Sequence, residues 1–197
     1  MLGSQEATLS TESKLYVQLQ PDAPTMQWLL NAQNQLTNAM RVPENQLHMT
    51  IIHFGKISKM IDSIRYHADT SEPNLLAEAQ CLADRWRIRL QYIEEATIFM
   101  KPARSSLFGV HENNYVVEFE VPEYVLQLHR DCLSDLHVFF RSIGIDNPEQ
   151  FMQQDANFQH ALGLRPHVTL AKQYTGIVYP LHTPPTSASF HCMRVIY

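Results

Sequence analysis

Two short segments, one in each half of the chain, repeat the same alternation of polar and apolar residues. Each carries a histidine and a threonine two positions apart, between apolar residues, in residues 47–51 (LHMTI) and 166–170 (PHVTL). Side chains two positions apart share one face of a β-strand. His48 therefore points the same way as Thr50, and His167 the same way as Thr169. The fold must then hold, in both halves, a strand with one buried face and one polar face.

Similar elements surround the two segments. In the first half we expect a strand over 15–20 (LYVQLQ), a helix over 25–40 whose apolar stripe includes Met40, and a strand over 46–54 that ends at Gly55. A partly helical connection over 60–74, a helix over 72–86, strands within 88–100, a turn at Pro102 and Ser105-Ser106, and a hairpin of 107–110 with 115–121 follow. A helix over 123–143 that stops at Gly144, a loop or short helix over 146–163, and strands over 164–171 and 190–197 complete the chain. This mixture predicts an α+β fold.

The residue types in the two segments suit the cleavage of a phosphodiester. A base must take a proton from the attacking oxygen and an acid must give one to the leaving oxygen, and histidine can do either near neutral pH. His48 and His167 can therefore act as an acid–base pair. Thr50 and Thr169 can donate hydrogen bonds to the non-bridging phosphate oxygens, where charge changes in the transition state. Such a reaction needs no metal ion.

The overall charge favours a small substrate over a long nucleic acid. The formal net charge is −5, and the sequence contains no block of lysines and arginines. A protein that grips a long nucleic acid usually carries a basic face. The densest basic cluster is Arg85, Arg87 and Arg89. The chain also lacks a glycine-rich phosphate loop, which argues against the use of nucleoside triphosphates.

Cysteine content and hydropathy indicate a cytoplasmic protein. Cys81, Cys132 and Cys192 are far apart and odd in number, which argues against a disulfide framework and against a zinc site. We expect all three in or near the core. No apolar run is long enough to cross a membrane. Residues 1–13 are polar and lack the pattern of a secretory signal, so we expect a flexible tail there and a single domain over 14–197.

Both segments resemble the motifs of the two-histidine (2H) phosphoesterase superfamily, which includes bacterial RNA 2′-5′ ligase-like proteins and cyclic phosphodiesterases. Residues 47–55 (LHMTIIHFG) are similar to its first motif and residues 165–172 (RPHVTLAK) to its second. The resemblance implies an α+β fold of two pseudo-symmetric lobes, each an antiparallel sheet with helices outside, around a central cleft. It also implies activity on 2′,3′-cyclic phosphates, 1″,2″-cyclic phosphates, 2′-5′ linkages or cyclic oligonucleotides.

Carried over to this sequence, the resemblance makes His48 and His167 the catalytic pair. Thr50 and Thr169 become the phosphate ligands. Lys172 is expected to contact the substrate, although arginine is common at this position in bacterial members. Lysine keeps the positive charge but not the forked geometry of a guanidinium group.

Four further residues are candidates for contact with the substrate. Tyr16 and Gln18 lie on the polar face of the first predicted strand, which borders the cleft in this superfamily. Arg165 shares a strand face with His167 and can attract a phosphate group. Tyr174 follows the second motif and can stack on a base.

The other histidines are expected outside the site. His53 lies five residues after His48 and falls on the opposite strand face by strict alternation. No pair of histidines has the His-Glu-x-x-His spacing of a catalytic zinc helix. We therefore expect neither a metal ion nor a cofactor.

The sequence thus predicts a metal-independent phosphodiesterase that cleaves a small nucleotide or an RNA end by two-histidine acid–base catalysis. Its expected partner is that substrate, without a long nucleic-acid tract or a membrane. Two alternatives stay open. The same cleft can serve a nucleotide-binding module that does not turn over its ligand, or the two His-x-Thr copies can be a coincidence. The sequence does not choose among the substrates or say which histidine is the base.

Overall fold

The chain is an α+β fold, which a computed structural model describes for residues 9–68, 70–91, 97–109 and 111–196. These residues form the strands β1 (Lys14–Pro21), β2 (Met40–Arg41), β3 (Met49–Lys56), β4 (Ile98–Phe108), β5 (Asn114–Glu120), β6 (His167–Lys172) and β7 (Ala188–Ile196). The α-helices are α1 (Ala23–Asn34), α2 (Ile57–Ile64), α3 (Glu72–Gln91), α4 (Glu123–Ser142) and α5 (Pro148–Gln154). Two short 3-10 helices are η1 (Glu44–Gln46) and η2 (Gln159–Ala161).

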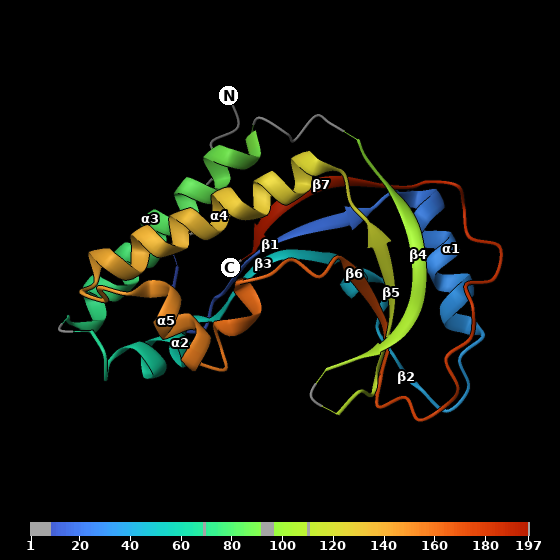
Figure 1. Cartoon of the computed structure of the whole chain (residues 1–197), viewed down its shortest axis with the longest axis horizontal. Coiled ribbons are helices and arrows are strands. Elements are labelled where there is room, and N and C mark those ends of the chain that lie inside the picture. The colour runs from blue at the N-terminus through green and yellow to red at the C-terminus, as the bar shows by residue number, and fades with distance from the viewer. Residues whose placement is uncertain (1–8, 69, 92–96, 110, 197) are drawn as a thin grey trace.

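The strands form two three-stranded antiparallel units that are joined at both edges. One unit has the order β3-β1-β7 and the other the order β6-β5-β4. β3 pairs with β6 at one junction and β7 with β4 at the other, while β2 extends the edge of β6. Each unit forms the centre of one lobe, which confirms the predicted two-lobed architecture (Figure 1). The two predicted sheets are continuous with each other rather than separate.

The two halves of the chain place equivalent elements in equivalent positions. β1 and α1 precede the motif strand β3, as β5 and α4 precede the motif strand β6. The next long strand after each motif, β4 in the first half and β7 in the second, pairs with the central strand of the other unit. The lobes therefore exchange their third strands, and neither half can form its sheet without the other.

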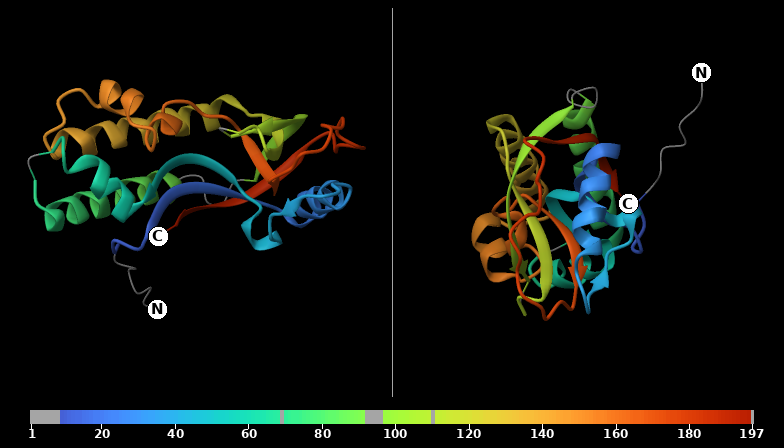
Figure 2. Two further views of the ribbon diagram at one scale, coloured as in Figure 1. Left: turned by 90° about the horizontal axis from the view of Figure 1, so that it is seen from below. Right: turned by 90° about the vertical axis from the view of Figure 1, so that its right-hand side faces the viewer.

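Helices cover the strands on two sides. α2, α3 and α4 pack on β3 and β7, whereas α1 packs on β1, β6 and β7. Figures 1 and 2 place α1 at one end of the molecule and α2 and α5 at the other. Among the described helices, none combines the length and the apolar composition needed to cross a membrane.

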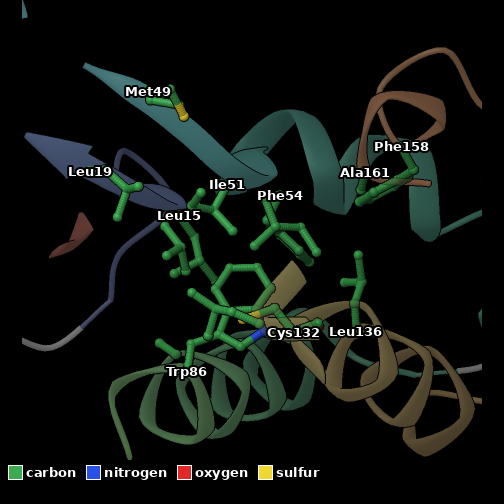
Figure 3. Close-up of a cluster of buried hydrophobic side chains, with 14 of the residues drawn as sticks. Leu15, Leu19, Met49, Ile51, Phe54, Trp86, Cys132, Leu136, Phe158 and Ala161 are labelled. Carbon is green, nitrogen blue, oxygen red and sulfur yellow. Dashed lines mark hydrogen bonds between the residues drawn. The ribbon is translucent and has the colours of Figure 1, made fainter. Parts of the chain in front are cut away.

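Part of the core joins the motif strand β3 and its neighbour β1 to α3 and α4. Figure 3 shows Leu15, Ile51 and Phe54 of the strands pointing toward Trp86 and Cys132 of the helices. Trp86 is fully buried, and its indole N–H donates a hydrogen bond of 3.1 Å to the carbonyl of Cys132. This apolar layer fixes one face of β3, so its polar residues are turned to the other face.

Helix α1 is shorter than the apolar pattern predicts. Asp22 caps its start, because its side chain accepts a hydrogen bond of 2.9 Å from the backbone N–H of Thr25. The helix ends at Asn34, and Asn38 has a φ of 55°, in the left-handed region that stops helices. Met40 therefore does not belong to the helical stripe and is exposed in β2.

Two predictions between residues 88 and 108 are wrong. Residues 88–91 extend α3 instead of forming a strand, because Leu90 continues the buried stripe of Trp86 one helical turn later. Pro102 and the two serines at 105 and 106 do not form a turn but lie inside β4. Pro102 is tolerated there because the register shifts between it and Arg104. Residues 92–96 lie outside the described residues.

The cysteines differ from one another in burial. Cys132 is buried in α4, as expected, but Cys81 is exposed on α3, so the prediction of a core position is wrong for Cys81. Cys81 falls between the buried positions Ala79 and Leu82 of that helix, and the apolar pattern of the sequence does not distinguish it from them. The side chain of Cys192 lies outside the described residues.

The structure describes only residues 9–13 of the predicted N-terminal tail. Residues 1–8 lie outside the described residues, whereas Leu9 is buried and its backbone N–H donates to the side chain of Gln80 on α3. The carbonyls of Thr11 and Ser13 accept hydrogen bonds from the first residues of α2. Residues 9–13 are therefore hydrogen-bonded to α2 and α3.

Gly55 does not end β3 but permits an irregular backbone within it. It has a φ of 107° and lies at a register shift between β1 and β3. A Cβ atom there would lie 2.9 Å from Cε of Met60. We expect Gly55→Ala to lower the free energy of unfolding by about 1–2 kcal/mol, because a side chain strains this conformation.

Urea denaturation measures this change, and Gly163→Ala is the matched control. A Cβ atom at Gly163 meets nothing within 4 Å, so the control should change stability by less than about 0.5 kcal/mol. Equal effects of the two substitutions would contradict the role assigned to Gly55.

Candidate active site

The two His-x-Thr segments lie side by side where β3 meets β6. Met49 pairs with Val168 in an antiparallel register, and both side chains are fully buried. In an antiparallel pair the flanking positions run in opposite directions, so each motif histidine lies opposite the threonine of the other strand. An approximate twofold axis therefore passes between Met49 and Val168. The four polar side chains alternate with these buried residues and share the opposite face of the two strands.

Both imidazoles are held in the same way. Nδ1 of His48 lies 2.7 Å from the carbonyl oxygen of Gln46, and Nδ1 of His167 lies 2.6 Å from that of Arg165. A carbonyl oxygen only accepts hydrogen bonds, so Nδ1 carries the proton in each ring. This fixes the orientation of the ring and leaves Nε2 as the nitrogen that can act on a ligand.

Burial lowers the pKa of both histidines below the ordinary value. For His48 the loss of hydration is the largest cause, opposed by the carbonyl of Gln46, and the charge of His167 lowers the pKa further. For His167 the loss of hydration is again the largest cause, with Arg165 lowering and Glu118 raising its pKa. The effect of His167 on His48 indicates that the two rings lie within electrostatic range of each other.

A cleft with two arms runs over this face of the strands. The first arm has a volume of about 550 Å³ and contains His48 and Tyr16, together with residues of α2 and η2. The second arm has a volume of about 500 Å³ and contains His167, with residues of the β4–β5 hairpin. Thr50, His53 and His160 line both arms and so join them. Each arm is large enough for part of a nucleotide-sized ligand.

A β-bulge after each motif threonine brings a further side chain to the strand face of the motif histidine. The register of β3 against β1 skips Ile51, and the register of β6 against β5 skips Leu170. A bulge shifts the alternation of faces by one residue. His53 and Lys172, each five residues after a motif histidine, therefore come to the same face as that histidine.

The prediction that His53 faces away from His48 is wrong for this reason. His53 lines both arms of the cleft, and its ring centroid lies 6.1 Å from that of Tyr16. Strict alternation along β3 does not hold across the bulge. Lys172 is exposed, and its charge contributes to the lowered pKa of His48, so it lies near the first motif.

The two candidates on β1 lie beside the first motif. The ring of Tyr16 is stacked near that of His48, with centroids 6.0 Å apart and an angle of 20° between the planes. Gln18 is opposite Thr50 in the strand register and is buried. Within the described part of the chain its Oε1 has no hydrogen-bond partner. A buried acceptor without a donor is suited to a hydroxyl or amino group of a ligand, or to a water.

Arg165 lines the second arm together with an aromatic residue that the sequence did not single out. The guanidinium carbon of Arg165 lies 3.9 Å from the ring centroid of Phe108. The Phe108 ring is also stacked on that of His167, with centroids 4.4 Å apart. Phe108 comes from the end of β4, far from the second motif along the sequence, so no signal near that motif marks it.

Tyr174 does not face the cleft. Its ring is 2% exposed and packs edge-on against Tyr115 at a centroid distance of 5.2 Å. Its hydroxyl donates a hydrogen bond of 2.8 Å to the carbonyl of Ile177. These contacts bury the tyrosine as a core residue, so the prediction that it stacks on a substrate base is wrong.

Two further residues near the site, of which His160 lines the cleft, come from segments without a recognisable motif. Glu118 lies opposite His167 in the register of β5 and β6, and His160 comes from η2. Among the described residues, no group of three or more His, Cys, Asp or Glu side chains is arranged to hold a metal ion. The groups that the cleft does offer are imidazoles, hydroxyls and cations, which suit proton transfer next to an anionic group.

Solved structures share this arrangement of strands and helices, although no protein-family model and no curated protein matches the sequence. E. coli LigT in complex with 3′-AMP aligns with a TM-score of 0.54 at 12% identity, over 90% of this chain and 83% of that one. A structure described as a phosphoesterase aligns with a TM-score of 0.57 at 11% identity, over 90% of this chain and 84% of that one. TT0787 of Thermus thermophilus aligns with a TM-score of 0.53 at 16% identity, over 93% of this chain and 84% of that one. This chain has the LigT fold.

The three structures belong to the 2H phosphoesterase superfamily, so the resemblance carried by the two motifs is confirmed at the level of the fold. LigT has also been crystallised with phosphate, ATP and NADP+. At 11–16% identity the likeness concerns the fold alone. The chemistry of this LigT-like chain therefore depends on its own cleft residues.

Proposed function

We propose that the chain is a phosphodiesterase that cleaves a small nucleotide or RNA-end phosphodiester with His48 and His167 as its acid–base pair. The observation that carries this proposal is the antiparallel pairing of the two motifs at Met49 and Val168. It sets two imidazoles across one patch of the sheet and provides a threonine hydroxyl beside each.

In the proposed reaction the phosphorus lies between the two Nε2 atoms. One neutral imidazole takes a proton from the attacking water as the new P–O bond forms. The other imidazole, protonated, gives its proton to the leaving oxygen as the ester bond breaks. Thr50 and Thr169 donate to the non-bridging oxygens, and the ammonium of Lys172 balances their negative charge. The products are a phosphomonoester and a free hydroxyl.

The charges around the two rings favour His48 as the base and His167 as the acid. The neighbours that act through charge on His48, namely His167 and Lys172, are both cations and favour its neutral form. His167 has one cation, Arg165, and one anion, Glu118, and the anion favours its protonated form. The charges near His48 therefore favour the neutral form that a base needs, and the anion near His167 favours the protonated form that an acid needs.

We expect kcat/KM to follow a bell-shaped pH profile with its maximum on the acid side of 6.5, the ordinary pKa of histidine. Activity rises as His48 loses its proton and falls as His167 loses its own, and the pKa of each is lowered, so both limbs move to lower pH. Because kcat/KM reports the free enzyme, initial rates at low substrate concentration measure this. A maximum above 6.5 would contradict the proposed roles.

The proposed function is tested on a panel of 2′,3′-cyclic mononucleotides, 2′-5′-linked dinucleotides and cyclic dinucleotides. Each is incubated with the purified protein, with and without a chelator, and the products are separated by chromatography. We expect turnover of at least one diester at a rate that the chelator does not change. Binding detected by calorimetry without any product would instead indicate a nucleotide-binding module.

A further inference from the structure

One arm of the cleft concentrates positive charge in an acidic chain. The arm that contains His48 extends to Lys14, Lys56 and Lys59, which are three of the five lysines in the sequence. None of the residues that line this arm is Asp or Glu, although the formal net charge of the chain is −5. We call this arm of the cleft the lysine arm.

The lysine arm is assembled in a way that does not favour stability. Lys14 and Lys56 are directly opposite each other in the register of β1 and β3, where like charges repel. Glu12 relieves this in part through an ion pair of 2.6 Å with Lys56. Among the described residues, Lys14 and Lys59 make no ion pair, so two ammonium groups stay available to an anion.

Helix α2 adds to the positive potential of the arm. Lys59 lies in the first turn of α2, where the helix dipole is positive and an acidic side chain is normally preferred. The first turn of α2 contains no acidic residue, and no side chain caps it. A cation at this end of a helix is unfavourable unless an anion is bound there.

The position of the arm relates it to the reacting phosphate. Tyr16, His48 and Thr50 line the same arm as the lysines, and in the register of β1 and β3 the Lys14–Lys56 pair lies at one end of the two strands while Thr50 lies opposite Gln18. His53 and His160 lie at the junction of this arm with the second arm and can donate hydrogen bonds. An anionic group bound by the lysines therefore lies in the same arm of the cleft as a phosphate held at His48.

We propose, on the basis of the function proposed above, that the lysine arm binds a second phosphate of the same substrate. The preferred substrate class is then a nucleotide or short oligonucleotide that carries a phosphate beyond the scissile one. A nucleoside whose only phosphate is the scissile diester leaves Lys14 and Lys59 without a counter-charge. Such a substrate is turned over with a lower kcat/KM.

The test compares the binding of adenosine 2′-monophosphate and adenosine 2′,5′-bisphosphate by calorimetry. We expect the bisphosphate to bind the wild-type protein about tenfold more tightly, because two charge-assisted contacts form at a solvent-exposed site. This advantage should shrink as salt is added. The double variant Lys14→Ala/Lys59→Ala should lose the advantage, while binding of the monophosphate changes little.

Lys101→Ala is the matched control, because Lys101 lies on β4, pairs with Glu120 and lines neither arm. It should keep the full advantage. Equal dissociation constants for the two ligands in the wild type, or an advantage that persists in the double variant, would overturn the proposal.

The ligands contain no diester, so this result does not depend on turnover. A protein that hydrolyses no diester but prefers the bisphosphate through Lys14 and Lys59 keeps the second phosphate site and refutes the phosphodiesterase. If the protein hydrolyses diesters but does not prefer the bisphosphate, only the proposal that the lysine arm binds a second phosphate is refuted. The kinetic counterpart is the ratio of kcat/KM for 2′,3′-cyclic AMP with and without a 5′-phosphate, which should fall in the double variant.

Discussion

Replacement of His48 or His167 with alanine should lower kcat/KM for the hydrolysed diester by about 10²- to 10⁴-fold, the usual range for loss of a general acid or base. Each substitution removes a ring that a backbone carbonyl holds with Nε2 free for proton transfer. The double variant should be little worse than either single variant, because groups that act as a unit do not add. Initial rates on the diester identified from the panel measure all three.

The matched control for this experiment is His182→Ala. His182 is exposed in the loop between β6 and β7 and lines neither arm of the cleft, so its loss should leave the rate unchanged. Added imidazole should restore part of the activity of the single variants, a response that a structural role of the ring would not give. Thermal unfolding checks that each variant is folded. Full activity in both His48→Ala and His167→Ala would refute the assignment.

The polar face of each motif strand could be predicted because alternation is a local property. From His48 to Thr50, and from His167 to Thr169, the segment is too short for a bulge to alter the alternation of side chains between the two faces of the strand. The buried partners Met49 and Val168 are likewise apolar in the sequence. The order of strands and helices was also readable, because each long helix has a regular apolar stripe.

The bulges could not be predicted, because nothing in the local sequence marks an extra residue in a strand. Ile51 and Leu170 are ordinary strand residues, and only the pairing of β3 with β1 and of β6 with β5 leaves them without partners. Strict alternation therefore assigns His53 to the wrong face. The same long-range pairing explains why the sequence does not reveal Phe108, since β4 reaches the second motif only through its exchange between lobes.

The two bulges occupy the same place in both halves of the chain, directly after the motif threonine. In each half the bulge brings the residue five positions after the histidine to the same strand face as that histidine, and this residue is His53 in β3 and Lys172 in β6. Bulges often re-aim side chains next to active sites. Their symmetric position argues that the His-x-Thr copies are equivalent parts of one site rather than a coincidence of sequence.

The side chains of the two threonines should contribute unequally to the reaction. Thr50 lines both arms of the cleft, whereas Thr169 lines neither, so Thr50 has the freer access to a bound phosphate. Thr50→Val removes a hydroxyl but keeps the shape of the side chain. We expect it to lower kcat/KM by about 10- to 150-fold, since a hydrogen bond to a charged group contributes about 1.5–3 kcal/mol. Thr169→Val should have a smaller effect.

Thr50→Ser separates the hydroxyl from the rest of the side chain and should keep most of the activity. Thr175→Val, in the exposed loop after β6, is the matched control and should behave as the wild type. The pH of maximum kcat/KM should not move in Thr50→Val, because the threonine holds the phosphate and does not transfer its proton. If Thr50→Val kept the full rate, stabilisation of the phosphate oxygens would fall to the cations Lys172 and Arg165, and the hydroxyls would serve only the packing of the strands.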